Sequence, residues 1–306
     1  MKWTGKKIGL ALGGGGVRGM AHIGVLNVLE QEGIKIDLIV GTSVGALIGG
    51  AYAAGIAPHE ITAKVDSYLK SPEFEESAIK SISMSFSPGP KSIFQKVQIF
   101  ARNQYYLVRA LFGRSILSSN EFQSIIKYLL PDIDIRDTNI PFRAVATDLI
   151  TGAQIVLSEG SLRQAVLASS SVPGAAEPVR MGEWLLADGG VTSLVPVDAT
   201  RKAGADVVIA VMVDRDLPVD IEIETAKDVL YRSGEITANA LEAAELQNAD
   251  IIIRPAVGDL HWTDFSRSKD MVRIGEDAAR LALKKINASL PLYRRISRVV
   301  RRFIKQ

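Results

Sequence analysis

The stretch IDLIVGTSVGALIGGAYAA, residues 36–54, decides the fold. Its first part, Ile36–Val40, is a short apolar run that predicts a buried strand. Its second part, Val44–Ala54, is rich in small residues and predicts a tightly packed helix. A buried strand that leads into a helix is typical of a parallel sheet covered on both faces. The stretch therefore predicts an α/β protein.

The rest of the chain supports the same architecture. Upstream, Lys7–Leu12 predicts a buried strand, and the apolar spacing of Met20–Gln31 predicts a helix. Downstream, we expect strands at Phe142–Thr147, Gln154–Leu157, Trp184–Ala187, Val207–Val213 and Ile251–Ile253, and helices at Leu162–Ser169 and Ile221–Asn248. We predict a three-layer α/β fold around a mainly parallel sheet, in one domain over residues 1–275.

Two basic segments stand apart from this pattern. Lys80–Arg114 contains no acidic residue and interleaves basic with aromatic side chains, which predicts a basic, helical, lid-like insertion over residues 80–115. Residues 276–306 form a basic C-terminal segment, and Arg294–Lys305 predicts an amphipathic helix. Both segments could bind an anionic membrane surface. The alternative for the tail is a helix whose apolar stripe packs on its own domain.

Composition excludes several classes of site. The 306 residues include no cysteine and only three histidines, so disulfides, thiol catalysis and a multi-histidine metal site are not expected. The net charge of +2 does not call for nucleic acid, and no recognition motif accompanies the basic segments. We expect a cytoplasmic protein, with peripheral membrane contact as an open alternative. Its oligomeric state is left open.

The pentapeptide Gly41-Thr42-Ser43-Val44-Gly45 has the G-x-S-x-G spacing. Glycines at both ends remove side chains that would clash on a sharp strand-to-helix turn, and the turn lifts the Ser43 hydroxyl clear of the sheet. The positive end of the following helix favours developing negative charge. The motif therefore predicts that Ser43 is a nucleophile.

The glycine-rich loop Gly13–Gly19 has two interpretations. Its N–H groups could form an oxyanion hole for acyl transfer, because glycines allow close backbone approach. Alternatively, Gly14, Gly16 and Gly19 satisfy the G-x-G-x-x-G fingerprint of dinucleotide sites. That fingerprint requires an acidic residue at the end of the second strand, whereas Asp37 is near its start. The oxyanion hole is therefore the favoured interpretation.

A nucleophilic serine needs a base. His261 would give the order Ser43–Asp188–His261, as in α/β-hydrolases, but only two strands precede Ser43, fewer than that fold requires. His22 lies in the first helix and is expected to be packed or capping. Asp188 precedes two glycines at a strand end, but a carboxyl with an ordinary pKa of ~3.9 is a poor base unless burial raises it.

The chain resembles the patatin-like phospholipases, in particular their stand-alone bacterial members. The matching blocks run from about Ile8 to Val213 and comprise Gly14–Gly19, Ala21–Leu26, Gly41–Gly45, Ala146–Leu149 with Thr151-Gly152, Ala168–Pro173 and Asp188–Val191. One departure concerns an aromatic residue and two prolines near Ala175–Pro178, of which only Pro178 is present, and it affects the shape of the acyl pocket.

The resemblance implies a Ser–Asp dyad and needs no metal or cofactor. It assigns Ser43 as nucleophile and Asp188 as base. The further site residues that it implies are Gly14, Gly15, Gly16 and Arg18 in the oxyanion loop, Gly41 and Gly45 in the nucleophile elbow, and Gly189 and Gly190 in the D-G-G turn. The implied activity is acyl-ester hydrolysis of lipids, phospholipase A-like or lysophospholipase-like, through an acyl-enzyme. Two alternatives are an acyltransferase that uses the same serine and a non-catalytic adaptor on the same scaffold.

Overall fold

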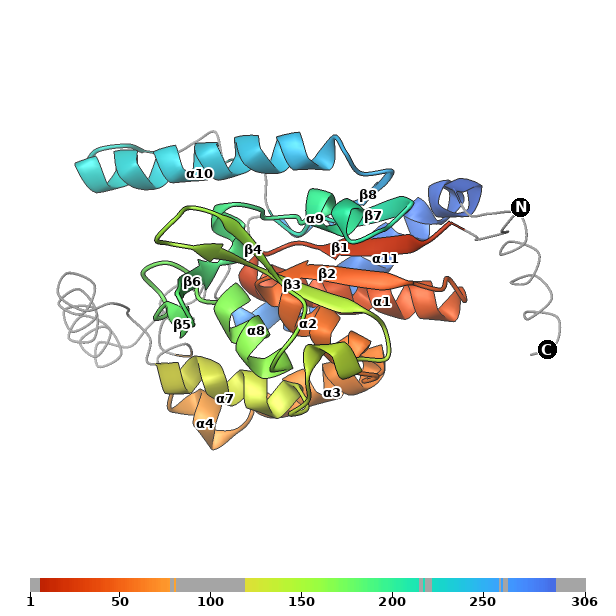
Figure 1. Cartoon of the computed structure of the whole chain (residues 1–306), viewed down its shortest axis with the longest axis horizontal. Coiled ribbons are helices and arrows are strands. Elements are labelled where there is room, and N and C mark those ends of the chain that lie inside the picture. The colour runs from red at the N-terminus through yellow and green to blue at the C-terminus, as the bar shows by residue number, and fades with distance from the viewer. Residues whose placement is uncertain are drawn as a thin grey trace.

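The computed structural model of the chain describes residues 6–77, 80, 119–214, 217, 222–258, 260 and 264–289. Within these residues eight strands form one sheet (Figure 1). They are β1 (Ile8–Leu12), β2 (Leu38–Thr42), β3 (Phe142–Asp148), β4 (Gln154–Leu157), β5 (Val179–Met181), β6 (Trp184–Asp188), β7 (Val207–Val211) and β8 (Ile251–Ile253). The hydrogen-bonded pairs run β5-β6-β3-β2-β1-β7-β8, and β4 also pairs with β3. Strands β3, β2, β1, β7 and β8 are parallel, which confirms a mainly parallel sheet.

Helices cover both faces of this sheet (Figure 1). They are η1 (Gly16–Met20), α1 (Ala21–Gln31), α2 (Val44–Ala53), α3 (Pro58–Tyr68), α4 (Pro72–Glu75), α7 (Ser119–Leu129), η2 (Ile135–Asp137), α8 (Leu162–Ser169), η3 (Gly189–Val191), α9 (Val197–Lys202), α10 (Ala226–Leu246), η4 (Phe265–Arg267) and α11 (Ser268–Ser289). Strand side chains alternate between two cores: Leu10 and Leu12 pack with α1 and α2, whereas Ala11 packs with α9. The predicted three-layer α/β fold is confirmed.

Two element boundaries differ from the prediction for local reasons. Strand β2 begins at Leu38 rather than Ile36, and the carboxylate of Asp37 accepts the N–H of Ile8 (2.8 Å) where a strand carbonyl would otherwise do so. Helix α10 begins at Ala226 rather than Ile221. There Thr225 Oγ1 accepts the N–H of Asp228 (3.2 Å) while Asp228 Oδ2 accepts the N–H of Thr225 (2.9 Å), a capping box that fixes the start.

Helix α11 packs along α1 with the two backbones almost in contact. A Cβ added to Gly24 would lie 1.9 Å from the carbonyl oxygen of Val272, and one added to Gly275 would lie 1.9 Å from that of Ala21. The expected domain boundary between residues 275 and 276 falls inside this helix. The first turns of the predicted C-terminal segment therefore belong to a helix that packs on the main core.

The two basic segments fall largely beyond these elements. Except for Lys80, the insertion at residues 80–115 lies outside the described residues, and so does Arg294–Lys305. None of the helices in the described part of the chain is long and apolar enough to cross a lipid bilayer.

Candidate active site

Strands β2 and β6 meet head to head along one edge of β3. Strand β2 ends with Thr42 opposite Val145, and β6 ends with Asp188 opposite Ala146. Strand β4 pairs with residues 144–147, so it overlaps both partners and must occupy the other edge. The register therefore brings Ser43, the residue after β2, beside Asp188, although the two are far apart in the sequence.

Ser43 occupies a strained turn. It is the one non-glycine residue of the described chain with a positive φ, +56°. A Cβ on Gly45 would lie 2.2 Å from the carbonyl oxygen of Leu12, and one on Gly41 would lie 2.5 Å from that of Gly45. Both glycines are therefore required for the strand and helix to approach this closely. The turn has the geometry of a nucleophile elbow.

The elbow is fixed by hydrogen bonds to neighbouring segments. The N–H of Ser43 donates to Ser169 Oγ (3.0 Å), whose own hydroxyl donates to the carbonyl of Val145 (2.6 Å). On the other side, Thr42 Oγ1 donates to the carbonyl of Ser193 (3.0 Å). These contacts leave the Ser43 hydroxyl as the polar group that the turn presents toward Asp188.

Asp188 is buried at the end of β6 and is held by the turn that follows it. Its Oδ1 accepts the N–H of Gly190 (2.7 Å), and its own N–H donates to the carbonyl of Ser171 (2.8 Å). Gly189 lies so close to β3 that an added Cβ would be 2.2 Å from the carbonyl oxygen of Val145. The D-G-G turn therefore aims the carboxylate rather than leaving it in solvent.

Burial raises the pKa of Asp188 to about 6, against smaller lowering effects of the Ser43 hydroxyl and the Gly190 N–H. The Ser43 hydroxyl is thus close enough to favour the charged carboxylate. Nevertheless, Oδ2 is buried and has no hydrogen-bond partner of good geometry among the described residues. A free carboxylate oxygen beside a serine hydroxyl, with a pKa near neutrality, is suited to take a proton.

The glycine loop runs past the same point. A Cβ on Gly14 would lie 3.4 Å from Ser43 Cβ. The N–H of Gly14 donates to the carbonyl of Leu194 (2.9 Å), so it is not available to a ligand in this conformation. Gly15 and Gly16 have φ of +150° and +61°, and in the described chain their N–H groups donate no backbone hydrogen bond. Among the predicted oxyanion donors, these two remain open.

Arg18 braces this loop from within the protein. Its side chain is buried, Nε donates to the carbonyl of Gly15 (3.1 Å), and Nη1 lies 2.6 Å from Asp214 Oδ1. The guanidinium therefore fixes the direction of the Gly15 carbonyl. Its place in the loop is structural support for the backbone donors.

His22 holds the start of the loop. It is fully buried, and its Nε2 lies 2.8 Å from the carbonyl oxygen of Gly13. Burial lowers the pKa of His22 to about 4, so the ring is neutral at physiological pH. Because a carbonyl can only accept, Nε2 carries the proton. With the Gly14 N–H bound to Leu194, the peptide between Gly13 and Gly14 is fixed at both ends.

A buried carboxylate beneath the site was not identified from the sequence. Glu245 of α10 accepts hydrogen bonds from the Ser193 hydroxyl and from the N–H of Val195 (3.3 Å), and burial raises its pKa to about 7. The same segment, residues 193–195, contacts the site: the carbonyl of Ser193 accepts from the Thr42 hydroxyl, and the carbonyl of Leu194 accepts from the N–H of Gly14. Its only sequence signal was an acidic residue in an amphipathic helix, which is indistinguishable from a solvated one.

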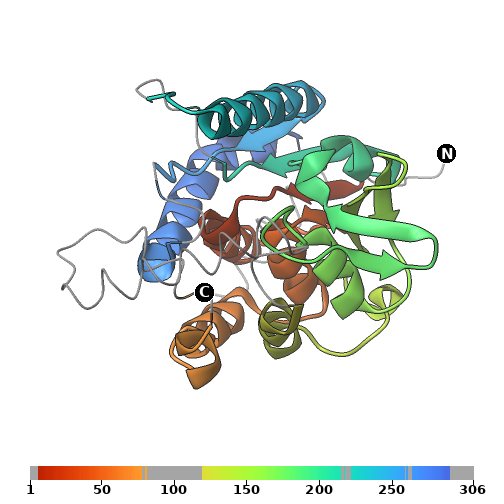
Figure 2. The ribbon, with the colours of Figure 1, turned by 90° about the vertical axis from the view of Figure 1, so that its left-hand side faces the viewer.

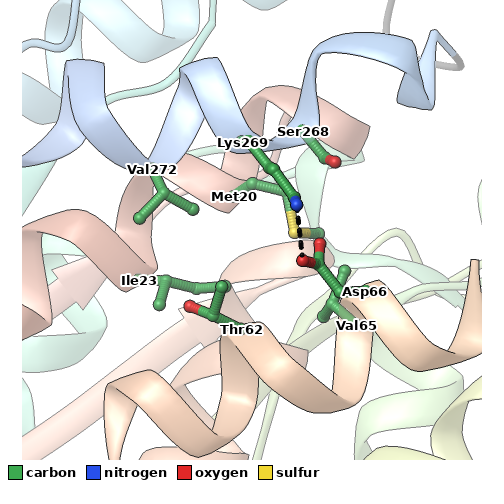
Figure 3. A pocket seen from close by; sticks show the side chains of 8 residues that line it. All are labelled: Met20, Ile23, Thr62, Val65, Asp66, Ser268, Lys269 and Val272. Carbon is green, nitrogen blue, oxygen red and sulfur yellow. Dashed lines mark ion pairs between the residues drawn. The ribbon is translucent and has the colours of Figure 1, made fainter.

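A small apolar cleft elsewhere does not belong to this site. It opens between α1, α3 and α11 (Figure 3) and is lined by Met20, Ile23, Thr62, Val65, Asp66, Ser268, Lys269 and Val272. Lys269 Nζ lies 3.1 Å from Asp66 Oδ2 across it. Neither Ser43 nor Asp188 lines the cleft. In the described part of the chain, no group of three or more His, Asp or Glu residues is placed to hold a metal ion.

The chain is similar to several known proteins. A family model described as patatin-like phospholipase matches residues 10–201. An NTE family protein of Mycobacterium tuberculosis is 31% identical over 67% of this chain and 48% of its own length. Lysophospholipase NTE1 of Saccharomyces cerevisiae is 26% identical over 92% of this chain and 17% of its own. The crystal structure of VipD from Legionella pneumophila gives a TM-score of 0.46 at 14% identity, over 92% of this chain and 67% of that one. The chain spans about half the length of the mycobacterial relative and less of the yeast one.

Proposed function

Because the chain belongs to the patatin-like phospholipase family, we propose that it hydrolyses acyl esters of lipids through a dyad of Ser43 and Asp188. The observation that carries this proposal is the meeting of the two residues at the ends of head-to-head strands, with the carboxylate buried. The similarity to a yeast protein named lysophospholipase supports a lysophospholipid as a first substrate to test.

The reaction begins with attack of Ser43 Oγ on the ester carbonyl carbon while Asp188 takes the hydroxyl proton. The tetrahedral intermediate collapses, the carbon–oxygen bond to the alcohol breaks, and the leaving alcohol takes the proton from Asp188. This leaves the acyl group on Ser43. Water then attacks the acyl-enzyme, Asp188 takes its proton, and fatty acid leaves as Ser43 Oγ is protonated again.

The glycine loop supplies the electrostatic part of this mechanism. The N–H groups of Gly15 and Gly16 are open, and in this mechanism they face the negative charge that forms on the carbonyl oxygen of the substrate. One such donor typically lowers the barrier by about 3 kcal/mol. The positive end of α2 adds to the same field.

The test is product analysis with lysophosphatidylcholine and the full-length chain. We expect free fatty acid and glycerophosphocholine in equal amounts. Adding an excess of a second lysolipid or a long-chain alcohol should leave the fatty acid as the main acyl product. Transfer of most acyl groups to the added acceptor would show a transferase instead, and an absence of any ester cleavage would contradict the enzymatic proposal itself.

The rate should depend on pH through Asp188. Only the deprotonated carboxylate can accept a proton, and its pKa is about 6, so kcat/KM on a soluble p-nitrophenyl ester should rise with pH around a midpoint of about 6. Glu245, whose pKa is about 7, serves as the control, because Glu245→Gln should leave that midpoint in place. A flat profile across this range would argue against Asp188 as the base.

His22 should act as a positioning residue for the loop. We expect His22→Phe, which keeps the ring volume and removes the donor to Gly13, to lower kcat by about tenfold or more while KM changes little, since oxyanion donors act in the transition state. His22→Gln keeps a donor near Nε2 and should recover most of the loss. The exposed His59 provides the control variant His59→Gln. Equal losses in both His22 variants, or a change in KM alone, would contradict this role.

A further inference from the structure

Three large apolar side chains stand exposed near the candidate active site. Leu149 and Ile150, in the turn after β3, are 46% and 60% exposed, and Trp184, the first residue of β6, is 42% exposed. We call these three residues the apolar rim. Strands β4, β5 and β6 lie at the left-hand end of Figure 1, the end that faces the viewer in Figure 2.

The rim residues come from neighbouring backbone segments. The N–H of Leu149 donates to the carbonyl of Leu185 (2.8 Å), which joins the turn to the start of β6. Trp184 pairs with Met181 across the β5–β6 hairpin. The turn that carries Leu149 and Ile150 therefore lies beside the start of β6, where Trp184 is located.

Hydrogen bonds to Asp148 fix the conformation of the turn that exposes Leu149 and Ile150. The buried carboxylate of Asp148 accepts from Thr151 Oγ1 (2.7 Å), from the N–H of Leu185 (3.0 Å) and from the N–H of Ile150 (3.3 Å). The carbonyl of the same residue accepts the N–H of Gly152 (2.8 Å). The N–H of Thr151 also donates to the Asp148 carboxylate (3.3 Å), so Asp148 accepts five hydrogen bonds from the turn and from Leu185. These bonds hold the two aliphatic side chains of the turn in solvent, where each loses the benefit of burial.

The rim lies a short distance from the dyad along the strands. Trp184 and Asp188 are the two ends of β6, which at ~3.3 Å per residue are about 13 Å apart. Leu149 follows Ala146, the residue opposite Asp188, by three positions. Three positions correspond to about 10 Å at ~3.3 Å per residue. Both separations, Trp184 to Asp188 and Leu149 to Ala146, are less than the roughly 15 Å depth of one hydrocarbon leaflet. A lipid in contact with the rim is therefore within reach of the site.

The two described segments that carry the rim, the turn after β3 and the β5–β6 hairpin, have no net charge among their exposed residues. Residues 149–153 of the turn are all uncharged and exposed, and the adjoining hairpin exposes one cation, Arg180, and one anion, Glu183. Such a surface gains from contact with hydrocarbon but gains nothing from an anionic headgroup. Aliphatic side chains flanked by a tryptophan suit the boundary between headgroups and acyl chains.

We propose that the apolar rim inserts into the surface of an electrically neutral lipid aggregate and so holds the mouth of the active site against its substrate. The inference rests on the proposed function, because acyl lipids are presented in such aggregates. The partner is a zwitterionic lipid surface, of which phosphatidylcholine is the probe. Insertion is distinct from any electrostatic contact made by the basic segments.

Binding of the full-length chain to phosphatidylcholine vesicles in high salt tests the proposal, since salt screens contacts of the basic segments. We expect the double variant Leu149→Ser/Ile150→Ser to bind about tenfold more weakly or worse, because two aliphatic side chains that the lipid would bury are removed. Leu281→Ser is the matched control, because Leu281 is 85% exposed on α11. It should bind as the parent does.

Two activity measurements separate the rim from the chemistry. On vesicle-borne lysolipid the double variant should lose activity in parallel with binding, whereas its kcat/KM on a soluble short-chain ester should stay within about twofold of the parent. Ser43→Ala should bind vesicles normally while cleaving neither substrate. If the proposed function is wrong, the parent will not cleave the soluble ester in a Ser43-dependent way. If the rim proposal is wrong, the double variant will bind vesicles as the parent does.

Trp184 gives a direct readout of insertion. Brominated phosphatidylcholine should quench tryptophan fluorescence in the parent, and Trp184→Phe should remove most of that quenching. Unchanged vesicle binding by the double variant, or quenching that survives Trp184→Phe in full, would overturn the proposal. So would a rim-dependent dimer without vesicle binding, because it would make a second copy of the chain the occupant.

Discussion

Ser43→Ala is expected to reduce lipid-ester hydrolysis by about 10⁴-fold or more, because loss of the nucleophile removes the covalent step itself. The fold should be retained. The hydrogen bonds that fix the elbow use the backbone of Ser43 and the side chains of its neighbours, not the Ser43 hydroxyl. Initial rates on a p-nitrophenyl ester and on lysophosphatidylcholine measure the loss, and the melting temperature checks the fold.

Ser171→Ala is a matched control for this variant. Ser171 is another buried serine near the site, and its hydroxyl donates only to the carbonyl of Leu167 (2.8 Å). Removal of this hydroxyl should lower the free energy of unfolding by about 1 kcal/mol, the usual contribution of a neutral hydrogen bond. Activity should stay within about threefold of the parent, because the hydroxyl takes no part in the proposed reaction. Comparable losses in the two variants would mean that the serine effect is structural rather than chemical.

Asp188→Asn is expected to abolish activity nearly as fully and to stabilise the protein at neutral pH. Burial raises the pKa of Asp188 to about 6, above the ~3.9 of an unfolded chain, so the folded state holds the proton more tightly. Its contribution to stability is then fully present below about pH 4 and is lost as pH rises to about 6. An uncharged amide avoids that loss, which is on the order of 3 kcal/mol. Thermal denaturation at two pH values, alongside kcat, measures both effects.

Asp148→Asn is the control of opposite sign. Asp148 is also buried, but hydrogen bonds from Thr151 and Leu185 lower its pKa. Its charged form therefore stabilises the folded state above the unfolded pKa, and the amide should lower the melting temperature. A lower melting temperature in both variants, or retained activity in Asp188→Asn, would contradict the assignment of Asp188 as a destabilised catalytic base.

Most of the fold could be predicted because its signals are local. The apolar runs of β1, β2, β7 and β8 and the small residues of α2 mark buried elements whatever their partners. Helix α11 was not predicted, although its buried positions Met271, Gly275, Ala279, Ala282 and Ile286 follow a helical spacing. Its packing on α1, where Gly24 lies against the backbone of Val272 and Gly275 against that of Ala21, joins positions far apart in the sequence, so the spacing alone does not reveal it.

The candidate site likewise contains one residue that a local sequence motif predicts and others that only the fold brings together. Ser43 follows from a local motif between a strand and a helix. Asp188 came from family resemblance, because only the register of β2 and β6 on β3 brings it beside Ser43. The partners Ser169 and Glu245 act through hydrogen bonds to residues far away in the sequence. Which glycine N–H groups remain open likewise depends on the loop at Leu194, which the sequence places far from the glycine loop.

The most direct test of activation of Ser43 by Asp188 is covalent labelling by a fluorophosphonate followed by peptide mapping. The Ser43–Asp188 mechanism predicts one adduct per chain, located on Ser43, whose rate of formation falls as pH drops below about 6 and is strongly reduced in Asp188→Asn. An adduct on another residue, or unimpaired labelling of Ser43 in Asp188→Asn, would contradict the central claim that Asp188 activates Ser43.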